Sequence, residues 1–147
     1  MSATNDLIDY VVAAIQTSSV FTDFNFYTVS QWFEASGNLT MPCVYVHFNN
    51  ADTVLHHSGY EYNITFDIEM YVNALDTVTD DSVTEKNIQA AYYYGEELIN
   101  VLTNVSITGK YYTNDVRLVN MPVMNAIVEN TVGALAQITF GARKNIG

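Results

Sequence analysis

The sequence predicts an α+β domain in which a mainly antiparallel sheet carries an N-terminal helix and one long helix, in the order α-β-β-β-α-β-β. Two stretches place apolar residues three to four positions apart, as on one face of a helix, whereas the others alternate apolar and polar residues as strands do. The strand-like stretches are grouped, which favours an α+β sheet over a parallel α/β sheet. The chain has 147 residues, the length of one ordinary domain, so we assign residues 1–147 to a single domain.

The first helix is expected over residues 5–17. Leu7, Val11 and Ile15 recur on one side of such a helix, and Asp6 lies near its positive N-terminal end. A run of threonine and serine then ends the apolar pattern, which places the end of the helix there.

A first β segment is expected from Phe24 to Phe33, followed by a turn over residues 34–38. Pro42 then precedes a compact strand from Cys43 to Asn49, in which apolar residues share one face. Residues 50–58 are expected to form a connection.

The next predicted strand, from Tyr60 to Val72, is unusually long. Its thirteen residues alternate without a break, and at about 3.3 Å per residue they span roughly 43 Å, whereas an ordinary strand has about five to six residues. One face consists of Tyr60, Tyr62, Ile64, Phe66, Ile68, Met70 and Val72, and the other of Glu61, Asn63, Thr65, Asp67, Glu69 and Tyr71. Because such a strand exceeds the needs of a small core, we expect its overhang to pair with a neighbouring subunit.

The main helix is expected over residues 83–103. Ser82 and Glu85 have the spacing of a capping box, and an apolar stripe follows them. Within this stripe, the run from Tyr92 to Tyr94 wraps most of the helix circumference. At least one of these rings is therefore expected in the core and another at the rim, where tyrosine suits contact with a partner.

Two further strands are expected to close the chain. The first runs from Val116 to Asn120 and, after an interruption at Pro122, from Val123 to Glu129. The second runs from Gly133 to Arg143, and the pair Tyr111-Tyr112 is expected near the end of a connection.

Charge and composition exclude several classes of function. The formal net charge is −11, and residues 1–85 hold twelve of the sixteen acidic residues but no lysine or arginine. Tight binding of nucleic acid needs basic groups that displace phosphate counterions, so neither DNA nor RNA is expected as a tightly held ligand. No run of about 18 apolar residues and no basic N-terminal leader occur, so we expect neither a membrane span nor a signal peptide.

Histidine and cysteine do not indicate a metal site or a nucleophile. His56 and His57 are adjacent, so they do not both face one ion from a regular strand. The single cysteine, Cys43, lies roughly 13 Å along the strand from His47, too far for a hydrogen bond. Cys43 is expected to be a small buried hydrophobe.

Glu61, Asp67 and Glu69 share one face of the long strand. Same-face neighbours lie about 6.6 Å apart, a distance at which two carboxylates could act on a glycosidic bond. An evenly solvated outer face is the simpler interpretation. We therefore expect no enzymatic activity, no metal and no cofactor.

Several features in chain order carry a resemblance to a known family. They are the amphipathic helix Asn5–Thr17, the proline-initiated apolar strand Met41–Val46, the long strand Tyr60–Val72, the helix capped at Ser82, and the closing β pair that ends at Arg143-Lys144. In pattern and size, over nearly the whole chain, this order is similar to that of the small tail-terminator and tail-completion (neck) proteins of tailed bacteriophages.

The resemblance implies a structural protein of the virion. It would form a ring, usually of six copies, that caps the tail tube and offers a surface to the head connector or adaptor proteins. DNA would pass through this ring as cargo without being tightly bound, and no membrane would be involved. The protein would be located in the tail or neck of a virion assembled in the host cytoplasm.

Two alternatives stay open. The chain could be another part of the particle, such as a tube protein, an adaptor or a minor capsid protein, which assembly into open stacks would distinguish. It could instead be a small ligand-binding or enzymatic α+β dimer in which Tyr60 and Tyr62 line a deep pocket.

The contacts expected in the ring come from two sets of residues. Subunit or partner contacts are expected at Tyr60, Tyr62, Phe66, Tyr93, Arg143 and Lys144, with the two basic residues facing an acidic neighbour. A position facing solvent or the lumen is expected for Glu61, Asp67 and Glu69.

Overall fold

The structure is a computed structural model that describes residues 3–27, 31, 39–56, 59–73, 81–105, 111–124 and 131–145. Within these ranges it describes only the backbone of residues 3–5, 54, 56, 60, 81–87, 121–124 and 143–145.

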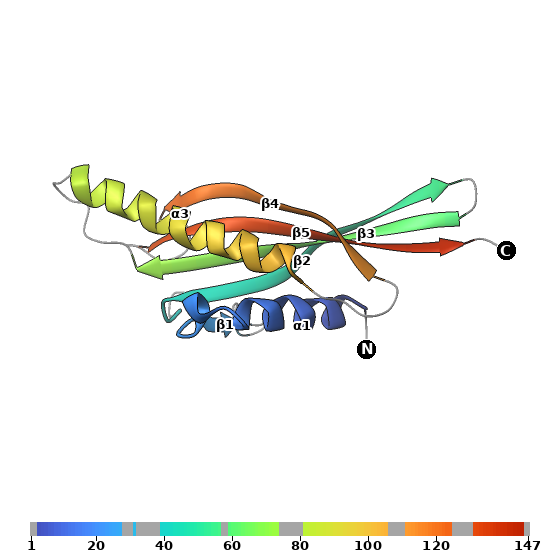
Figure 1. Cartoon of the computed structure of the whole chain (residues 1–147), viewed down its shortest axis with the longest axis horizontal. Helices are drawn as coiled ribbons and strands as arrows, with labels where there is room; N and C mark the ends of the chain where they lie inside the picture. Colours follow the sequence, from blue (N-terminus) through green and yellow to red (C-terminus); the bar gives the residue numbers. More distant parts are fainter. Residues whose placement is uncertain are drawn as a thin grey trace.

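The described residues form an open five-stranded mixed sheet and two α-helices (Figure 1). The strands are β1 (Asn25–Tyr27), β2 (Cys43–His56), β3 (Gly59–Asn73), β4 (Tyr111–Met124) and β5 (Thr131–Asn145). Their order across the sheet is β1-β2-β3-β5-β4, with β1 parallel to β2 and all other pairs antiparallel. The helices are α1 (Ala3–Gln16) and α3 (Asp81–Thr103), and a 3₁₀ turn, η1 (Ser19–Phe21), follows α1. The predicted α+β class and the order α-β-β-β-α-β-β are confirmed.

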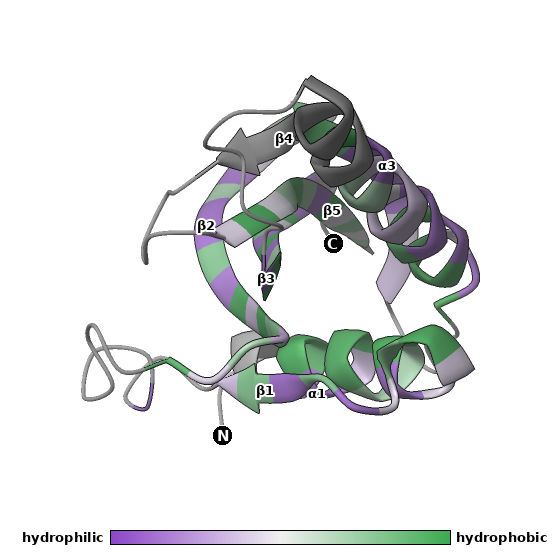
Figure 2. Cartoon of the chain, turned by 90° about the vertical axis from the view of Figure 1, so that its left-hand side faces the viewer, coloured by the Kyte–Doolittle hydropathy of each residue, from purple (hydrophilic) through white to green (hydrophobic). Residues whose placement is uncertain are grey.

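Both helices pack on the same side of the curved sheet (Figure 2). Their apolar stripes are fully buried at Leu7, Val11 and Ile15 of α1 and at Leu98 and Leu102 of α3. The sheet contributes alternate residues to this core, namely Val44, Val46, Ile64, Phe66, Ile68, Met70, Ala134, Ala136, Ile138 and Phe140. Since burying one large apolar side chain stabilises the fold by about 1.5–3 kcal/mol, this shared face holds the two layers together.

The long strand is confirmed, but its expected pairing with a neighbouring subunit is not needed. β3 pairs with β2 from Gly59 to Tyr71 on one side and with β5 from Gly59 to Asn73 on the other. Both edges of β3 are therefore filled within the same chain, over nearly its whole length.

The connection expected at residues 50–58 is wrong for its first seven residues, because β2 continues to His56. The register passes from Phe48 opposite Phe66 to Asn50 opposite Thr65, so one extra residue forms a β-bulge at this point. A bulge shifts the two-residue alternation by one position, which hides the second half of the strand from a reading based on strict alternation.

The first β segment is shorter than predicted. β1 ends at Tyr27 and Gln31 is helical, so a strand continuing to Phe33 is wrong. β1 pairs only with Cys43, Val44 and Tyr45 of β2, and a strand at the edge of a sheet needs no greater length. The turn expected at residues 34–38 lies outside the described residues.

β4 is one strand rather than two segments, and it begins at Tyr111, which was expected in a connection. Its pairing with β5 shifts register between Leu118 and Asn120 and again between Asn120 and Val123. These shifts accommodate Pro122, which lacks a backbone N–H and is tolerated on an edge strand. The part of the prediction beyond Met124 lies outside the described residues.

Both predicted helices are confirmed to within two residues at their ends. α3 already begins at Asp81, before the expected cap at Ser82. The side chains of the expected capping box lie outside the described ones, so that interaction stays a prediction.

Two glycines of β5 allow side chains to lie flat against the strand. A Cβ at Gly133 would collide with the backbone carbonyl oxygen of Met70 and come within 2.7 Å of the Tyr71 ring. The atoms nearest to a Cβ at Gly141 belong to the outer part of the Tyr112 ring, a side chain that is 41% exposed and can turn towards solvent if it gives up its hydrogen bond to Glu61.

We predict that Gly133→Ala lowers the free energy of unfolding by about 1–3 kcal/mol, because a backbone oxygen is fixed and the buried strands must move apart. Gly141→Ala is the matched control on the same strand and should cost clearly less. Urea unfolding followed by circular dichroism measures both. Equal losses for the two variants would contradict the assignment of Gly133 as a position that only glycine fits.

Candidate functional site

Successive side chains of β3 lie on opposite faces of the sheet, a core face and an outer face, as the alternation of its sequence predicts. The residues expected to make contacts on the core face differ strongly in exposure. Phe66 is fully buried between Phe48 and Phe140, with ring centroids 6.2 and 6.0 Å away. Tyr62 is 44% exposed, farther along the same face. Phe66 is therefore part of the core, whereas Tyr62 is part of the exposed surface of the sheet.

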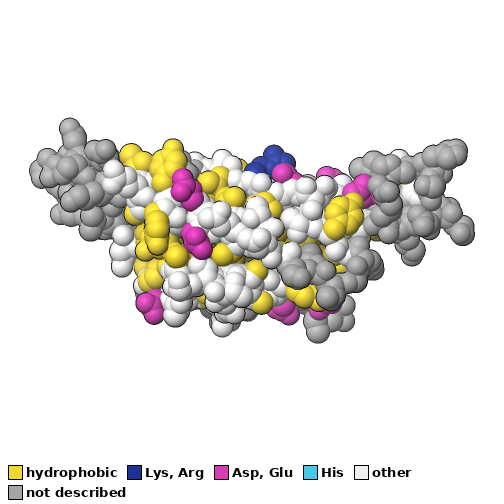
Figure 3. Space-filling model, in the orientation of Figure 1, with side chains coloured by type: hydrophobic (Ala, Val, Ile, Leu, Met, Phe, Trp, Pro, Cys, Tyr) yellow, Lys and Arg dark blue, Asp and Glu magenta, His cyan; other side chains and the backbone are white. Residues whose placement is uncertain are grey.

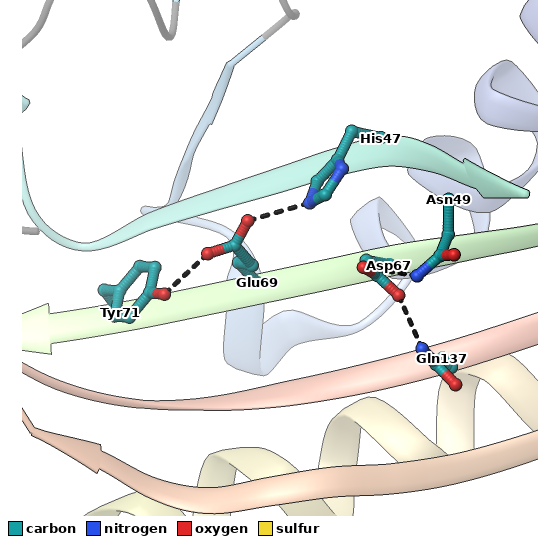
Figure 4. A network of polar contacts seen from close by, with 6 residues as sticks. All are labelled: His47, Asn49, Asp67, Glu69, Tyr71 and Gln137. Atoms are coloured by element: carbon teal, nitrogen blue, oxygen red, sulfur yellow. Dashed lines mark hydrogen bonds and ion pairs between the residues drawn. The ribbon is translucent and has the colours of Figure 1, made fainter. Parts of the chain in front are cut away.

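The outer face of the sheet carries a network of polar contacts (Figure 4). Glu69 Oε2 lies 2.8 Å from His47 Nε2, and the Tyr71 hydroxyl donates to Glu69 Oε1 at 2.7 Å. In a second group, the side-chain amides of Asn49 and Gln137 each donate to Asp67 at 2.9 Å. These carboxylates are held by neighbours on β2 and β5, so the evenly solvated face that we expected is instead a structured one.

Burial and hydrogen bonding set the charge of the His47–Glu69 pair. The hydrogen bond to Glu69 raises the pKa of His47 above its ordinary value of 6.5, against the opposing effect of burial. Burial of Glu69 would raise its pKa, but the hydrogen bonds from His47 and Tyr71 outweigh burial and hold the pKa below 4.5. The two shifts agree that the charged forms of both residues stabilise each other.

Cys43 lies at the end of this outer face and is fully buried, as predicted. Burial, with the nearby charge of Glu69 as a smaller cause, raises the pKa of its thiol to about 12. A thiol at such a pKa carries almost no thiolate near neutral pH, so it is a poor nucleophile. Tyr45, also buried, stacks on the His47 ring at a centroid distance of 4.5 Å.

The part of the sheet that extends beyond the two helices forms what we call the arm (Figure 1). It consists of residues 50–56 of β2, 59–65 of β3 and 139–145 of β5. Leu55 is 77% exposed on the arm, and Phe48, at its base, is 46% exposed. Ile64 and Phe140 at the base of the arm are buried in the core, whereas its outer end is a sheet surface with exposed apolar side chains and none of the described helices above it.

The outer face of the arm is polar. The Tyr112 hydroxyl donates a hydrogen bond to Glu61 Oε1, and the Asn114 amide donates to Asn63 Oδ1 at 3.0 Å. By register, Arg143 is the strand partner of Glu61, and Lys144 is the partner of Tyr60. The side chains of Tyr60, Arg143 and Lys144 lie outside the described ones, so their predicted contacts stay predictions.

The helices present a second exposed surface. Tyr92 and Tyr93 of α3 are 49% and 58% exposed, whereas Tyr94 packs against Phe24 with ring centroids 5.4 Å apart. The predicted division of this triplet between core and rim is confirmed. An open groove, which we call the helix groove, lies between α1 and the end of α3 and is lined by Tyr10, Ala13, Ala14, Thr17, Val101 and Asn104.

The described residues give no support to the ligand-binding alternative. Tyr62 lies on an exposed sheet surface rather than in a deep pocket. Among the described residues, no cluster of histidine, cysteine, aspartate and glutamate could hold a metal ion. In the same part of the chain, no helix is both long and apolar enough to cross a membrane.

Comparisons with known proteins yield a likeness of fold. No family model matches the chain, and no curated protein matches its sequence. Among solved structures, the chain is similar to the gp17 protein of bacteriophage SPP1, with a TM-score of 0.56 and 13% sequence identity. The alignment covers 99% of this chain and 94% of that protein. The similarity therefore concerns the whole fold rather than a local motif.

The His47–Glu69 pair predicts a pH-dependent stability. The contribution of His47, whose pKa is raised, is complete below about pH 6.5 and is lost as pH rises through the pKa of the folded state. The contribution of Glu69, whose pKa is lowered, is present above about pH 4.5 and is lost as pH falls through its pKa in the folded state. The pair therefore stabilises the fold most between about pH 4.5 and 6.5.

We predict that His47→Gln costs about 1 kcal/mol near pH 5.5 and much less at alkaline pH, above the raised pKa of His47, as measured by urea unfolding at fixed protein concentration. His56→Gln is the matched control, because His56 pairs with Gly59, ten residues along β3 from Glu69. A cost for His47→Gln that does not change with pH would argue against the charged pair.

Proposed function

We propose that this chain is a structural protein of a tailed-bacteriophage particle. The observation that carries the proposal is the fold shared with a bacteriophage protein over nearly the full length of both chains. The order of elements that resembles tail-terminator and neck proteins supports it further, because helix, long strand, second helix and closing β pair lie in one compact unit.

The specific role that we propose is a tail terminator or neck component. Six copies form a ring on the end of the tail tube, and this ring contacts the tube protein on one side and the head connector or adaptor proteins on the other. The molecule would be found in the tail or neck of the virion, after assembly in the host cytoplasm.

The charge of the chain fits a role next to DNA without binding it. With a net charge of −11, the surface repels a polyanion rather than replacing its counterions. In the face seen in Figure 3, acidic side chains are dispersed among apolar and neutral ones, and one basic patch appears at the upper edge. DNA would therefore pass such a ring as cargo.

No enzymatic activity is proposed. The outer-face carboxylates Asp67 and Glu69 already accept hydrogen bonds from side chains of β2, β3 and β5, and the Cys43 thiol is buried. These groups act as parts of the sheet rather than as an acid, a base or a nucleophile.

We predict that the purified protein, examined by light scattering over a range of concentration and salt, forms a closed species of roughly 98 kDa, six copies of a 16.4 kDa chain. Electron microscopy should show rings. Growth into open stacks would instead indicate a tube protein, and a stable dimer of roughly 33 kDa would contradict the ring.

The position in the particle has its own test. An antibody against this chain should label the junction of head and tail in purified virions that contain it. Labelling along the tail or over the capsid would contradict the terminator or neck role while leaving a structural role in the particle.

A further inference from the structure

The core face of the arm is free of acidic residues because of the bulge after Phe48. Beyond the bulge, Ala51, Thr53 and Leu55 lie opposite Ile64, Tyr62 and Tyr60, the residues that continue the core face of β3. Asp52 lies opposite Asn63, on the outer-face register. Without the extra residue the phase would be reversed, and Asp52 would share the face of Phe48 and Phe66.

The core face of the arm exposes several large apolar side chains. Single exposed leucines are common, but here Leu55, Tyr62 and Phe48 are 77%, 44% and 46% exposed on one side of one sheet. Phe48 continues the row of rings from Phe140 and Phe66, and the register places Tyr62 and Leu55 farther along the same face, so the exposed side chains extend the core face outwards. Large apolar side chains exposed together on one face of a sheet indicate an interaction site.

Charge favours a second copy of this chain as the occupant. Two chains that each carry −11 repel each other, so a contact between them must be made where acidic groups are absent. The core face of the arm meets this condition. The basic residue nearest to it in register is Lys144, the strand partner of Tyr60, and a basic group at this point suits an acidic neighbour such as another copy.

The helix groove offers the complementary surface. All six of its lining residues are uncharged, and Ala13 and Ala14 leave room between the helices. Exposed Asp9 and Glu96 lie on the same two helices, and their charge is opposite to that of Lys144, which the register places on the core face of the arm. A protruding leucine and a recess lined by small side chains thus occur in the same molecule, on different elements.

We propose that the tip of the arm, through Leu55, inserts into the helix groove of a second copy of this chain. Because the tip and the groove belong to different parts of the molecule, the contact is heterologous, and repeating it leads to a closed ring or an open helix rather than a symmetric dimer. The proposal rests on the proposed ring and names the contact that builds it.

Two single variants and their mixture test this contact. Leu55→Asp places a charge at the tip, and Ala13→Trp fills the groove. Each should weaken self-association at least about tenfold, since the buried area of one leucine is lost or blocked. In a mixture, the intact groove of Leu55→Asp meets the intact tip of Ala13→Trp, so dimers of roughly 33 kDa should form, and no rings.

Controls separate the contact from effects on folding. Val119→Asp removes another exposed strand residue, 47% exposed on β4, and should assemble like the unaltered chain. Leu55→Met should do the same. Circular dichroism and thermal unfolding should give folded chains for Leu55→Asp and Ala13→Trp, because Leu55 and Ala13 are exposed.

Every other outcome overturns either this contact or the proposed function. Normal assembly of Leu55→Asp, or full rings in the mixture, would show that the arm does not enter the groove, while rings as such would still support the proposed function. Assembly into open helices through this contact would keep the inference and refute the terminator. If the unaltered chain stays monomeric while Leu55→Asp loses binding to a tail protein, the occupant is that protein and not a second copy.

Discussion

The structure depends on the complete pairing of β3. This strand forms a ladder with β2 on one side and β5 on the other over nearly all its length, and its alternate residues supply the centre of the core. Backbone groups of a strand this long would otherwise need outside partners, and an unpaired edge promotes aggregation. Because both edges of β3 are paired within one chain, this strand needs no partner from another molecule. The outermost strands of the sheet and the exposed end of the arm are then the parts that can contact other molecules.

The bulge at Asn49 gives the two ends of the sheet different properties. Before it, β2 sends Val44 and Val46 into the core beneath the helices; after it, Leu55 takes that face while Asp52 is directed to the other. The side-chain amide of Asn49, the bulge residue, donates a hydrogen bond to Asp67, so the bulge is part of the polar network on the outer face. One extra residue therefore keeps acidic groups off the arm's core face and also holds a carboxylate of β3 in place.

Residue periodicity was enough to predict the fold class and the central strand, because Tyr60 to Val72 alternate strictly and the helix stripes repeat at helical spacing. Periodicity did not predict the strand ends that depend on how neighbouring strands pair. The bulge concealed residues 50–56, and register shifts let Pro122 lie inside β4. The outer network was also missed, since alternation places His47, Glu69 and Tyr71 on a face but does not show that β2 and β3 align them within hydrogen-bonding distance. The arm follows from the lengths of helices relative to strands, which only the folded chain reveals.

The arm and the polar network lie on opposite faces of the same strands, and this separation bears on how an acidic ring can form at all. A contact through the core face of the arm buries apolar and neutral groups, so association gains free energy without bringing the carboxylates of two copies together. Glu61, Asp67 and Glu69 stay on the other face, where hydrogen bonds from Tyr112, Gln137 and Tyr71 hold them. An interface arranged in this way would keep the net negative charge at the surface after assembly, which suits the proposed ring, past which DNA would move without adhering.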